Sequence, residues 1–338
     1  MQFAFGGEEM DSFLFAVSAV TPVILLVALG YAFKRIGLMK KDLARAVNRL
    51  VFRTFLPITL FLNVYKIEAL SGMRFGYIGY VLLVVLATFL VAVPVAVLVT
   101  KHSERRGPLV QVTFRSNYAL VGLPLAESLY GAAGAAVATL LSAAVIPLFN
   151  VLAVIGLSVF GEGEQRTGVK KILLGILKNP LILGIGAGAL CLLLRTLFVR
   201  WGIGFRLTQL TPVYQVLEYL SDVSTPLALL CLGAQFEFSA VKTLRREILV
   251  GTLARTLVVP LLGVGIAYFF LRSHFNGAHF AAFVAVFATP VAVSSVPMAQ
   301  EMGNDAALAG QYVVWTTLLS SLTIFLATFL LRWNGVLA

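Results

Sequence analysis

The stretch "SNYALVGLPLAESLYG", residues 116–131, interrupts a segment that is otherwise apolar and long enough to cross a membrane. Asn117, Gly122 and Pro124 lie within the apolar run 109–130. Proline lacks the N–H that a helix needs and clashes with the preceding turn, and glycine weakens that turn further. Hydrocarbon offers no partner for free backbone groups. The sequence therefore predicts that this break is covered by protein or lines a watered cavity.

Composition indicates a membrane protein along the whole chain. Of 338 residues, 59% are hydrophobic and 12% are charged, whereas soluble domains average about 25% charged residues. Apolar runs of about 20 residues, the length of a membrane-spanning helix, recur throughout. We predict an all-α integral membrane protein with ten spans, near 13–33, 43–65, 75–99, 109–130, 133–160, 172–194, 212–235, 246–271, 279–301 and 306–331.

The net charge of +11 predicts orientation and contact with membrane lipid, not binding of nucleic acid. Most Lys and Arg residues lie in short loops beside apolar runs, where basic residues favour the inner side. With the N-terminus outside, the inner loops hold 14 basic residues and the outer segments hold 7. The start, "MQFAFGGEEMDSFLF", lacks the basic region of a signal peptide. We expect a multi-pass protein of the plasma (inner) membrane with both termini outside.

Residues that carry chemistry are too scattered to predict a cofactor, a metal site or an enzyme. Cys191 and Cys231 sit inside apolar runs, where they are typical packing residues. The three histidines, His102, His274 and His279, are isolated at expected helix ends or in loops, which argues against a metal site. GxGD, GxSxG, HExxH and nucleotide-binding motifs are absent from the sequence, which argues against an intramembrane enzyme and against ATP-driven transport.

An internal repeat is indicated by the prolines. The polar stretch 161–171, expected to be a cytoplasmic linker, separates a first five-span repeat (1–160) from a second (172–338). One proline marks each of the first four spans of each half, namely Pro22, Pro57, Pro94 and Pro124, then Pro180, Pro226, Pro260 and Pro297. Because five is odd, the second half enters the membrane from the opposite side. The repeat is therefore predicted to be inverted.

The fourth and ninth spans align directly. "NYALVGLPLAESLYGAAGAA" lies over "PVAVSSVPMAQEMGNDAALA", with Asn117 opposite Pro290 and Pro124 opposite Pro297. Pro290 and Pro297 disrupt the ninth span at two places, and Ser294 and Ser295 lie between them. Two such breaks are tolerable if they cross each other at mid-membrane. We expect Ser294 and Ser295 to line the second break.

A crossing of this kind attracts ions. Half-helix N-termini carry about +0.5 charge each and favour an anion, while C-terminal carbonyls favour a cation. Asn117 can grip a carboxylate or, alternatively, replace lost backbone bonds at the break. Arg115 can neutralise an anion or extend to the inner headgroups. The sequence leaves both pairs of alternatives open.

Four carboxylates are candidates for ion coupling. Glu218 and Asp222, four residues apart on the seventh span, can carry a proton or cation, or can lie at the outer interface. Glu127 and Glu301 follow Pro124 and Pro297 by three and four residues, where a carboxylate also complements the helix dipole. A separate stripe of Arg45, Arg49 and Arg53 follows one face of the second span.

These segments resemble the auxin efflux carrier family. "SNYALVGLPLAESLYG" is similar to the family's fourth-helix signature, in which an Asn precedes Gly-x-Pro, and "TPVAVSSVPMAQEMG" resembles its ninth-helix counterpart. "TPVILLVALGYAFKRIG" and "STPLALLCLGAQF" resemble its first and seventh helices. The resemblance covers roughly residues 13–331. The long central loop of the plant members is absent, and Arg115 is not part of the family pattern.

The resemblance implies a ten-helix fold similar to that of bile-acid/sodium and sodium/proton transporters, with a scaffold part and a transport part. It implies a secondary carrier of small organic anions, auxin-like molecules or small carboxylates including dicarboxylates, moved by an elevator or rocking motion. It also implies that Asn117 helps hold the carboxylate. A sodium-coupled bile-acid-type symporter is the main alternative, and a channel is a third reading. A homodimer is compatible with the sequence.

Overall fold

The computed structural model describes residues 7–67, 75–161 and 169–337, which are helical apart from connecting segments and one isolated bridge. Seven helices within this part of the chain are long and apolar enough to cross a membrane. The α-helices are α1 Gly7–Arg35, α2 Lys41–Leu50, α3 Leu56–Tyr65, α4 Phe75–Val99, α5 Ser103–Phe114, α6 Leu123–Phe160, α7 Val169–Leu177, α8 Pro180–Arg200, α9 Thr211–Gln235, α10 Ala240–Thr243, α11 Arg245–Leu253, α12 Ile266–Leu271, α13 Gly277–Phe287, α14 Ser295–Glu301 and α15 Ala306–Trp333.

Most expected spans correspond to these helices, and the sixth differs. The expected span 172–194 is divided at Asn179, whose side chain accepts a hydrogen bond from Leu181 N–H and so caps α8. Pro180 follows in the first turn of α8, where its missing N–H costs nothing. Most of the expected linker 161–171 lies outside the described residues.

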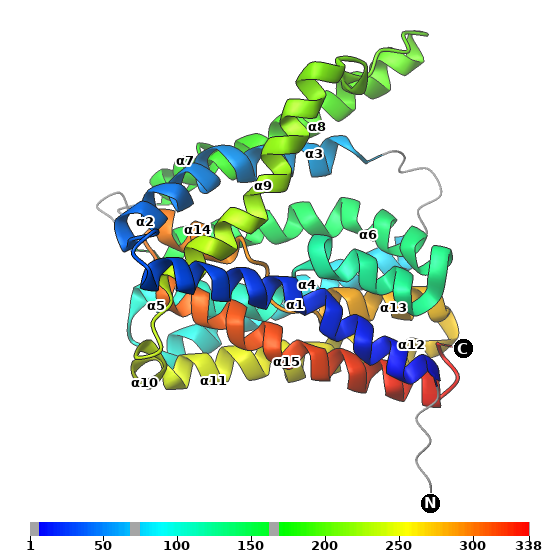
Figure 1. The fold of residues 1–338 in the computed structure, drawn as a ribbon. Coiled ribbons are helices and arrows are strands. Elements are labelled where there is room, and N and C mark those ends of the chain that lie inside the picture. The colour runs from blue at the N-terminus through cyan, green and yellow to red at the C-terminus, as the bar shows by residue number, and fades with distance from the viewer. Residues whose placement is uncertain (1–6, 68–74, 162–168, 338) are drawn as a thin grey trace, which may run out of the picture.

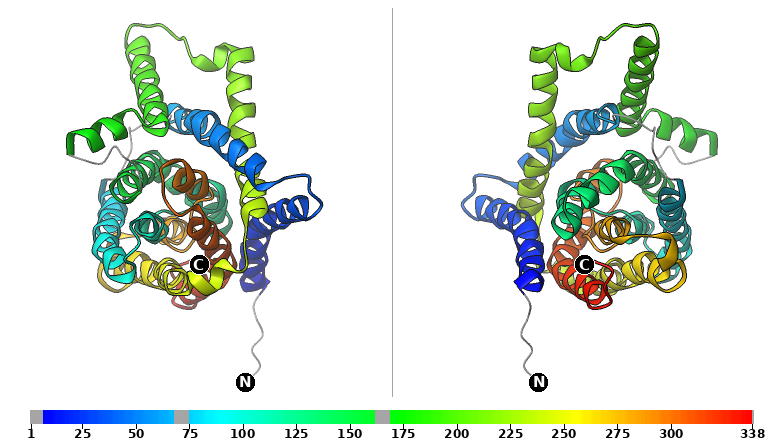
Figure 2. Two further views of the ribbon diagram at one scale, coloured as in Figure 1. Left: turned by 90° about the vertical axis from the view of Figure 1, so that its left-hand side faces the viewer. Right: turned by 90° about the vertical axis from the view of Figure 1, so that its right-hand side faces the viewer.

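The helices form two groups (Figure 1 and Figure 2). In the first, called here the outer group, α1 and α2 pack on α9, and α3 packs on α8 and α9; α1 also packs along α15 of the second group. In the second, the crossing bundle, α4–α6 pack with α11–α15 around a central α13. Almost every residue of α13 is buried, as expected for a helix that is apolar on all sides.

Glycines hold the outer group together at close range. A side chain at Gly30 of α1 would collide with the backbone of Leu230 in α9, and one at Gly184 of α8 would collide with Pro57 of α3. Small residues at helix contacts let backbones approach closely and pack well in a membrane. The outer group is therefore built as one tightly packed unit.

Four helical turns of the π type, with one extra residue per turn, interrupt the long helices. They are η1 Val51–Phe55, η2 Tyr118–Gly122, η4 Ala254–Val258 and η5 Leu261–Gly265. Such turns occur often at functional sites. α6 also bends sharply at Tyr130 and Gly131, where the φ of 57° at Gly131 is one that glycine adopts readily, so that residues 123–129 and 132–160 form two helices.

The fourth span breaks at a different place from the one expected. The chain is extended at Arg115 and non-helical at Asn117, between the end of α5 and the start of η2. Gly122 is helical, and Pro124 lies in the first turn of α6, where proline is tolerated. The prediction of a broken helix is right, but the break precedes Gly122 and Pro124 instead of occurring at them.

The ninth span breaks between α13 and α14, over residues 288–294, and this break contains Pro290 as expected. Pro297 is the third residue of α14. The two breaks meet: Asn117 N–H donates to Pro290 O over 2.8 Å, and Ser116 pairs with Val291 in an isolated antiparallel bridge. The expected crossing of broken helices is therefore present in the structure.

Candidate functional site

A cavity lies where the crossing meets the outer group. From the crossing bundle it is lined by both breaks, by the start of η2 and by α6; from the outer group it is lined by α3, α8 and α9. Its lining residues are Leu56, Thr59, Leu60, Asn63, Arg115, Ser116, Asn117, Tyr118, Ala119, Leu120, Ile146, Phe149, Asn150, Leu181, Thr225, Ala292, Val293, Ser294 and Met298. The site is thus shared between the two helix groups.

Arg115 is the charged residue of this cavity. Its side chain is only 4% exposed, so the alternative that it extends to the headgroups is wrong. One guanidinium nitrogen, Nη2, donates to Asn150 Oδ1 and to Ser294 Oγ, each over 2.7 Å, and Nη1 contacts Met298 Sδ. These partners are neutral, and none of the described residues that line the cavity is Asp or Glu.

Asn117 lies at the same break with a free amide. The residue is 8% exposed, and its Nδ2 group has no hydrogen-bond partner among the described residues. Its backbone is engaged, because Asn117 O accepts from the N–H groups of Val121 and Gly122. Asn117 therefore starts the helix through its carbonyl, while its buried side-chain Nδ2 group is left without a partner among the described residues.

The start of η2 adds further donors. Tyr118, Ala119 and Leu120 are the first residues of this helical segment and line the cavity. The first N–H groups of a helix lack intrahelical partners, and the helix dipole makes that end positive. Together with Arg115 and the Asn117 amide, they make this side of the cavity positive and rich in donors.

The other expected site residues have different places. Ser294 lines the cavity, whereas Ser295 is buried and its hydroxyl has no partner among the described residues. A side chain at Gly122 would meet the ring of Tyr118 and Ala285 O, so this glycine serves packing against α13. Pro290 contributes its carbonyl to the crossing. Pro124 and Pro297 lie in the first turns of α6 and α14.

The candidate coupling carboxylates do not gather at the cavity. Glu218 forms an ion pair with Lys66 over 3.0 Å, and Asp222 and Glu127 are exposed. Glu301 is 9% exposed at the end of α14, facing Arg49 Nε at 3.5 Å and Arg53 Nε at 3.8 Å. The arginine stripe of the second span therefore faces α14.

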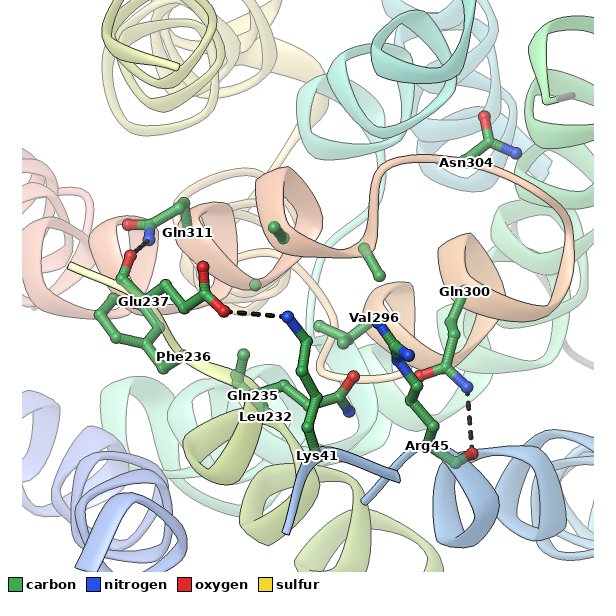
Figure 3. A pocket seen from close by; sticks show the side chains of 13 residues that line it. Lys41, Arg45, Leu232, Gln235, Phe236, Glu237, Val296, Gln300, Asn304 and Gln311 are labelled. Atoms are coloured by element: carbon green, nitrogen blue, oxygen red, sulfur yellow. Dashed lines mark hydrogen bonds and ion pairs between the residues drawn. The ribbon is translucent and has the colours of Figure 1, made fainter. Parts of the chain in front are cut away.

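A second cavity, also between the two groups, lies next to this contact (Figure 3). Gln300 of α14 accepts from Asn48 Nδ2 and donates to Arg45 O, each over 3.1 Å. Lys41 donates to Glu237 over 3.0 Å; this hydrogen bond and the lysine charge lower the pKa of the Glu237 carboxyl. Polar contacts thus join α2 to α14 at this end.

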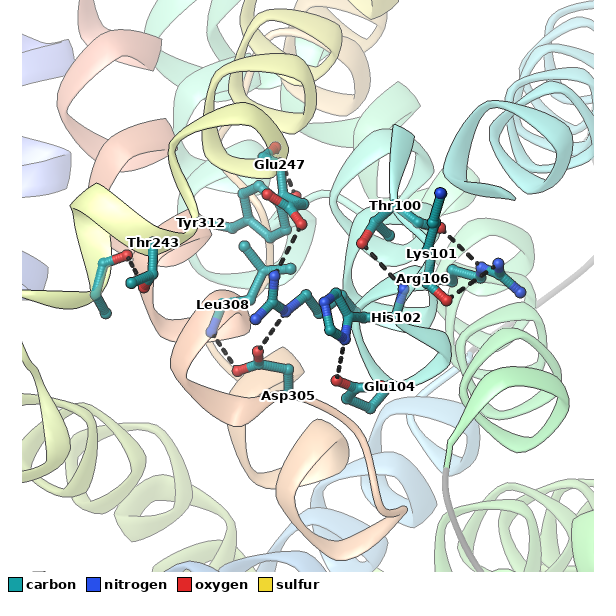
Figure 4. Close-up of polar contacts among 12 residues, drawn as sticks. Thr100, Lys101, His102, Glu104, Arg106, Thr243, Glu247, Asp305, Leu308 and Tyr312 are labelled. Carbon is teal, nitrogen blue, oxygen red and sulfur yellow. Dashed lines mark hydrogen bonds and ion pairs between the residues drawn. The ribbon is translucent and has the colours of Figure 1, made fainter. Parts of the chain in front are cut away.

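A third polar cluster stays within the crossing bundle. Arg105 of α5 contacts Glu247 of α11 over 3.1 Å and Asp305, the N-cap of α15, over 3.5 Å. Figure 4 shows Tyr312 beside Glu247, to whose carbonyl it donates over 2.8 Å. Because these residues come from three helices of one group, the cluster makes the crossing bundle more rigid.

Sequence reasoning missed several polar residues of the site. Asn63, Thr59 and Thr225 line it from the outer group, and Asn150 orients Arg115. Asn150 and Asn63 each interrupt an apolar run, and that was the signal that could have identified them.

The fold and this site define a multi-pass membrane protein with a cavity between two helix groups. A protein-family profile described as "Membrane transport protein" matches residues 15–328. The chain therefore belongs to this family of membrane transporters, and the resemblance to auxin efflux carriers is confirmed.

Two relatives carry compatible names. The chain is 25% identical over 331 residues to an uncharacterized transporter of Methanothermobacter thermautotrophicus, covering 92% of this chain and 97% of the relative. It is 28% identical over 234 residues to the uncharacterized transporter MJ1031 of Methanocaldococcus jannaschii, covering 67% of this chain and 70% of that protein.

Proposed function

We propose that the protein is a secondary carrier of small organic anions and that the cavity at the crossing is its substrate site. The observation that carries this proposal is Arg115: a buried guanidinium whose hydrogen-bond partners are neutral. A buried charge is costly unless it is paired. A bound carboxylate would supply the missing negative charge and could accept hydrogen bonds from Asn117 Nδ2, which is free of partners in the described part of the chain.

The rest of the cavity fits a carboxylate with an apolar body. Leu56, Leu60, Phe149 and Leu181 form apolar walls, whereas the donors cluster at the breaks. An aromatic or branched aliphatic acid satisfies both surfaces. A dicarboxylate would have to find partners for its second group among Asn63, Thr59 and Thr225.

The mechanism we propose is alternating access with elevator-like movement of the crossing bundle against the outer group. Three observations support it: the cavity lies between the groups, glycine contacts lock the outer group, and the Arg105 cluster ties α5, α11 and α15 together. Antiparallel contact between the two breaks supports ten spans in inverted halves, 1–160 and 172–338. We further propose a plasma-membrane location with both termini outside, from the distribution of basic loops.

A binding experiment with matched ligands tests the substrate class. Purified protein is titrated with indole acetate and with its neutral amide, which has the same shape without the charge. We expect only the acid to bind, and we expect Arg115→Met to lose that preference while Arg200→Met, an exposed control on α8, keeps it. Equal binding of acid and amide by the wild-type protein would contradict an anion site, and small aliphatic acids would be tested in the same way.

A further inference from the structure

The carboxyl-terminal end of α13 lies inside the crossing bundle and carries the negative end of its helix dipole. The last carbonyls of a helix have no intrahelical partners. In transporters with broken helices, such ends hold the coupling cation. The partners of these carbonyls therefore indicate which positive charge, if any, this protein uses at its crossing.

Protein groups occupy this end. Ala285 O accepts from the Thr289 hydroxyl, and Val286 O and Thr289 O accept from Arg255 Nη2 and Nε, all over 2.8 Å. Pro290 O accepts from Asn117 N–H. Arg255 thus spans the carbonyl end of α13 and the first part of the break.

Arg255 itself is completely buried, at 0% exposure, and no ion pair joins it to a carboxylate among the described residues. It comes from η4, the π-type turn in the neighbouring span. A neutral donor could bond the same carbonyls without the cost of burying a charge. The charge at this position therefore has a use beyond hydrogen bonding, and the negative end of α13 is the group it offsets.

We propose that Arg255 is a built-in counter-cation that takes the place of a coupling ion at the crossing. The inference rests on the proposed carrier function, because it concerns how that carrier is energised. Arg255 belongs to the same helix group as Arg115 and Asn117, so its charge moves with the substrate site. The carbonyl end of α13 is filled in every state of the cycle, and sodium has no role there.

Chemical rescue tests the proposal. Arg255→Ala leaves a space of about the shape of guanidinium, and urea is its neutral isostere. We expect this variant to unfold at a lower temperature and to lose uptake roughly tenfold or more, which corresponds to at least about 1.4 kcal/mol. Millimolar guanidinium, present from purification onward, should restore both properties, whereas urea at the same concentration should restore neither. Arg246→Ala, at an exposed position of the same span, serves as the control.

Rescue by both compounds would mean that only donors are needed, and rescue by neither would mean that no separable cation acts there; either result overturns the proposal. If Arg255→Ala cannot be purified under any condition, Arg255→Lys and Arg255→Gln decide. The lysine variant should resemble the wild type and the glutamine variant should not, while equal behaviour overturns the proposal. A sodium requirement in wild-type uptake also overturns it.

The thermal measurement separates this inference from the proposed function. If the protein proved not to carry organic anions, uptake could no longer be used as a measurement. Restoration of the unfolding temperature by guanidinium, but not by urea, would still establish a cation at the end of α13. Conversely, anion uptake by the wild-type protein combined with rescue of Arg255→Ala by urea would support the carrier function and contradict the proposal that Arg255 acts as a counter-cation.

Discussion

The backbone N–H of Asn117 donates to the carbonyl of Pro290, 173 positions further along the chain, over 2.8 Å. This bond joins the breaks of two helices, and backbone groups that each break leaves unpaired find hydrogen-bond partners in the other break. A free N–H or carbonyl in hydrocarbon costs several kcal/mol. The crossing is therefore a structural necessity as well as part of the proposed site. The bond uses the backbone of Asn117, and the side-chain Nδ2 group has no partner in the described part of the chain.

The first prediction separates these two roles of Asn117. Asn117→Ala keeps the backbone bond to Pro290 and removes only the amide. We expect anion uptake to fall roughly tenfold or more, with the protein remaining folded and monodisperse, because one charge-assisted hydrogen bond is worth about 1.5–3 kcal/mol. Uptake and size-exclusion chromatography measure the two effects. Unchanged uptake, or unfolding of the variant, would show that the amide serves the break instead of the substrate.

The second prediction concerns Glu301. Its carboxylate faces Arg49 and Arg53 across the boundary between the two helix groups. If the groups move against each other, these contacts must break and re-form. Glu301→Gln should therefore favour the state in which they are apart and change the uptake rate more than the affinity. Binding at equilibrium and initial uptake rates distinguish the two. Glu127→Gln, at an exposed position, is the control and should change neither.

The third prediction concerns stability. Gly131 has φ = 57° and ψ = −152°, a combination that is essentially restricted to glycine and costs a residue with a side chain roughly 1–3 kcal/mol. Gly131→Ala should lower the thermal unfolding midpoint. Gly79, in α4, likewise has free space where a Cβ would lie, but it has no positive φ. Gly79→Ala should leave the midpoint unchanged or raise it, since alanine favours the helix by about 1 kcal/mol. A similar decrease of the unfolding midpoint in both variants would mean that the added side chain itself, and not the backbone angle of Gly131, causes the loss of stability.

Orientation is the fourth prediction. Single cysteines are introduced at Asn334 and Arg206, both exposed, after Cys191 and Cys231 are replaced by serine. With both termini outside, they should react with an impermeant reagent on intact cells. Cysteines at Lys101 and Lys242, also exposed, should react only after permeabilisation. The opposite pattern would place the N-terminus inside.

The sequence identified the crossing because proline and asparagine in an apolar run have few structural explanations. It could not locate the break, because proline is tolerated in the first turn of a helix: α5 ends at Phe114, the helix resumes in η2 at Tyr118, and Pro124 follows only in the first turn of α6. The environment of Arg115 was also undecided, because depth depends on which helices surround it. Asn150, 35 residues away, decides that question by accepting its hydrogen bond.

For the carboxylates, the sequence indicated candidate functional residues that the structure does not place at the cavity. A charge in an apolar run predicts function only if the residue is enclosed, and enclosure depends on tertiary packing. Glu218 forms an ion pair with Lys66, which comes from a distant part of the sequence, and Asp222 is exposed. Arg255, which caps α13, lies in the expected span 246–271 and so carried the signal of a charge in an apolar run, but its partners are backbone carbonyls, which a sequence does not identify.

The last prediction concerns energy. An inside-negative potential expels a monovalent anion that moves alone, by about 2.3 kcal/mol per elementary charge per 100 mV. That is roughly a fifty-fold gradient, since each 1.4 kcal/mol is tenfold. With Arg255 at the carbonyl end of α13, and Glu218 and Asp222 away from the cavity, we expect uniport driven by the potential alone. Proteoliposomes loaded with substrate are given a potassium diffusion potential through valinomycin. Efflux should follow the sign and size of the potential and ignore sodium and pH gradients. Flux that follows a pH gradient and stops in Asp222→Asn would establish proton coupling instead, and strict sodium dependence would favour the bile-acid-type symporter.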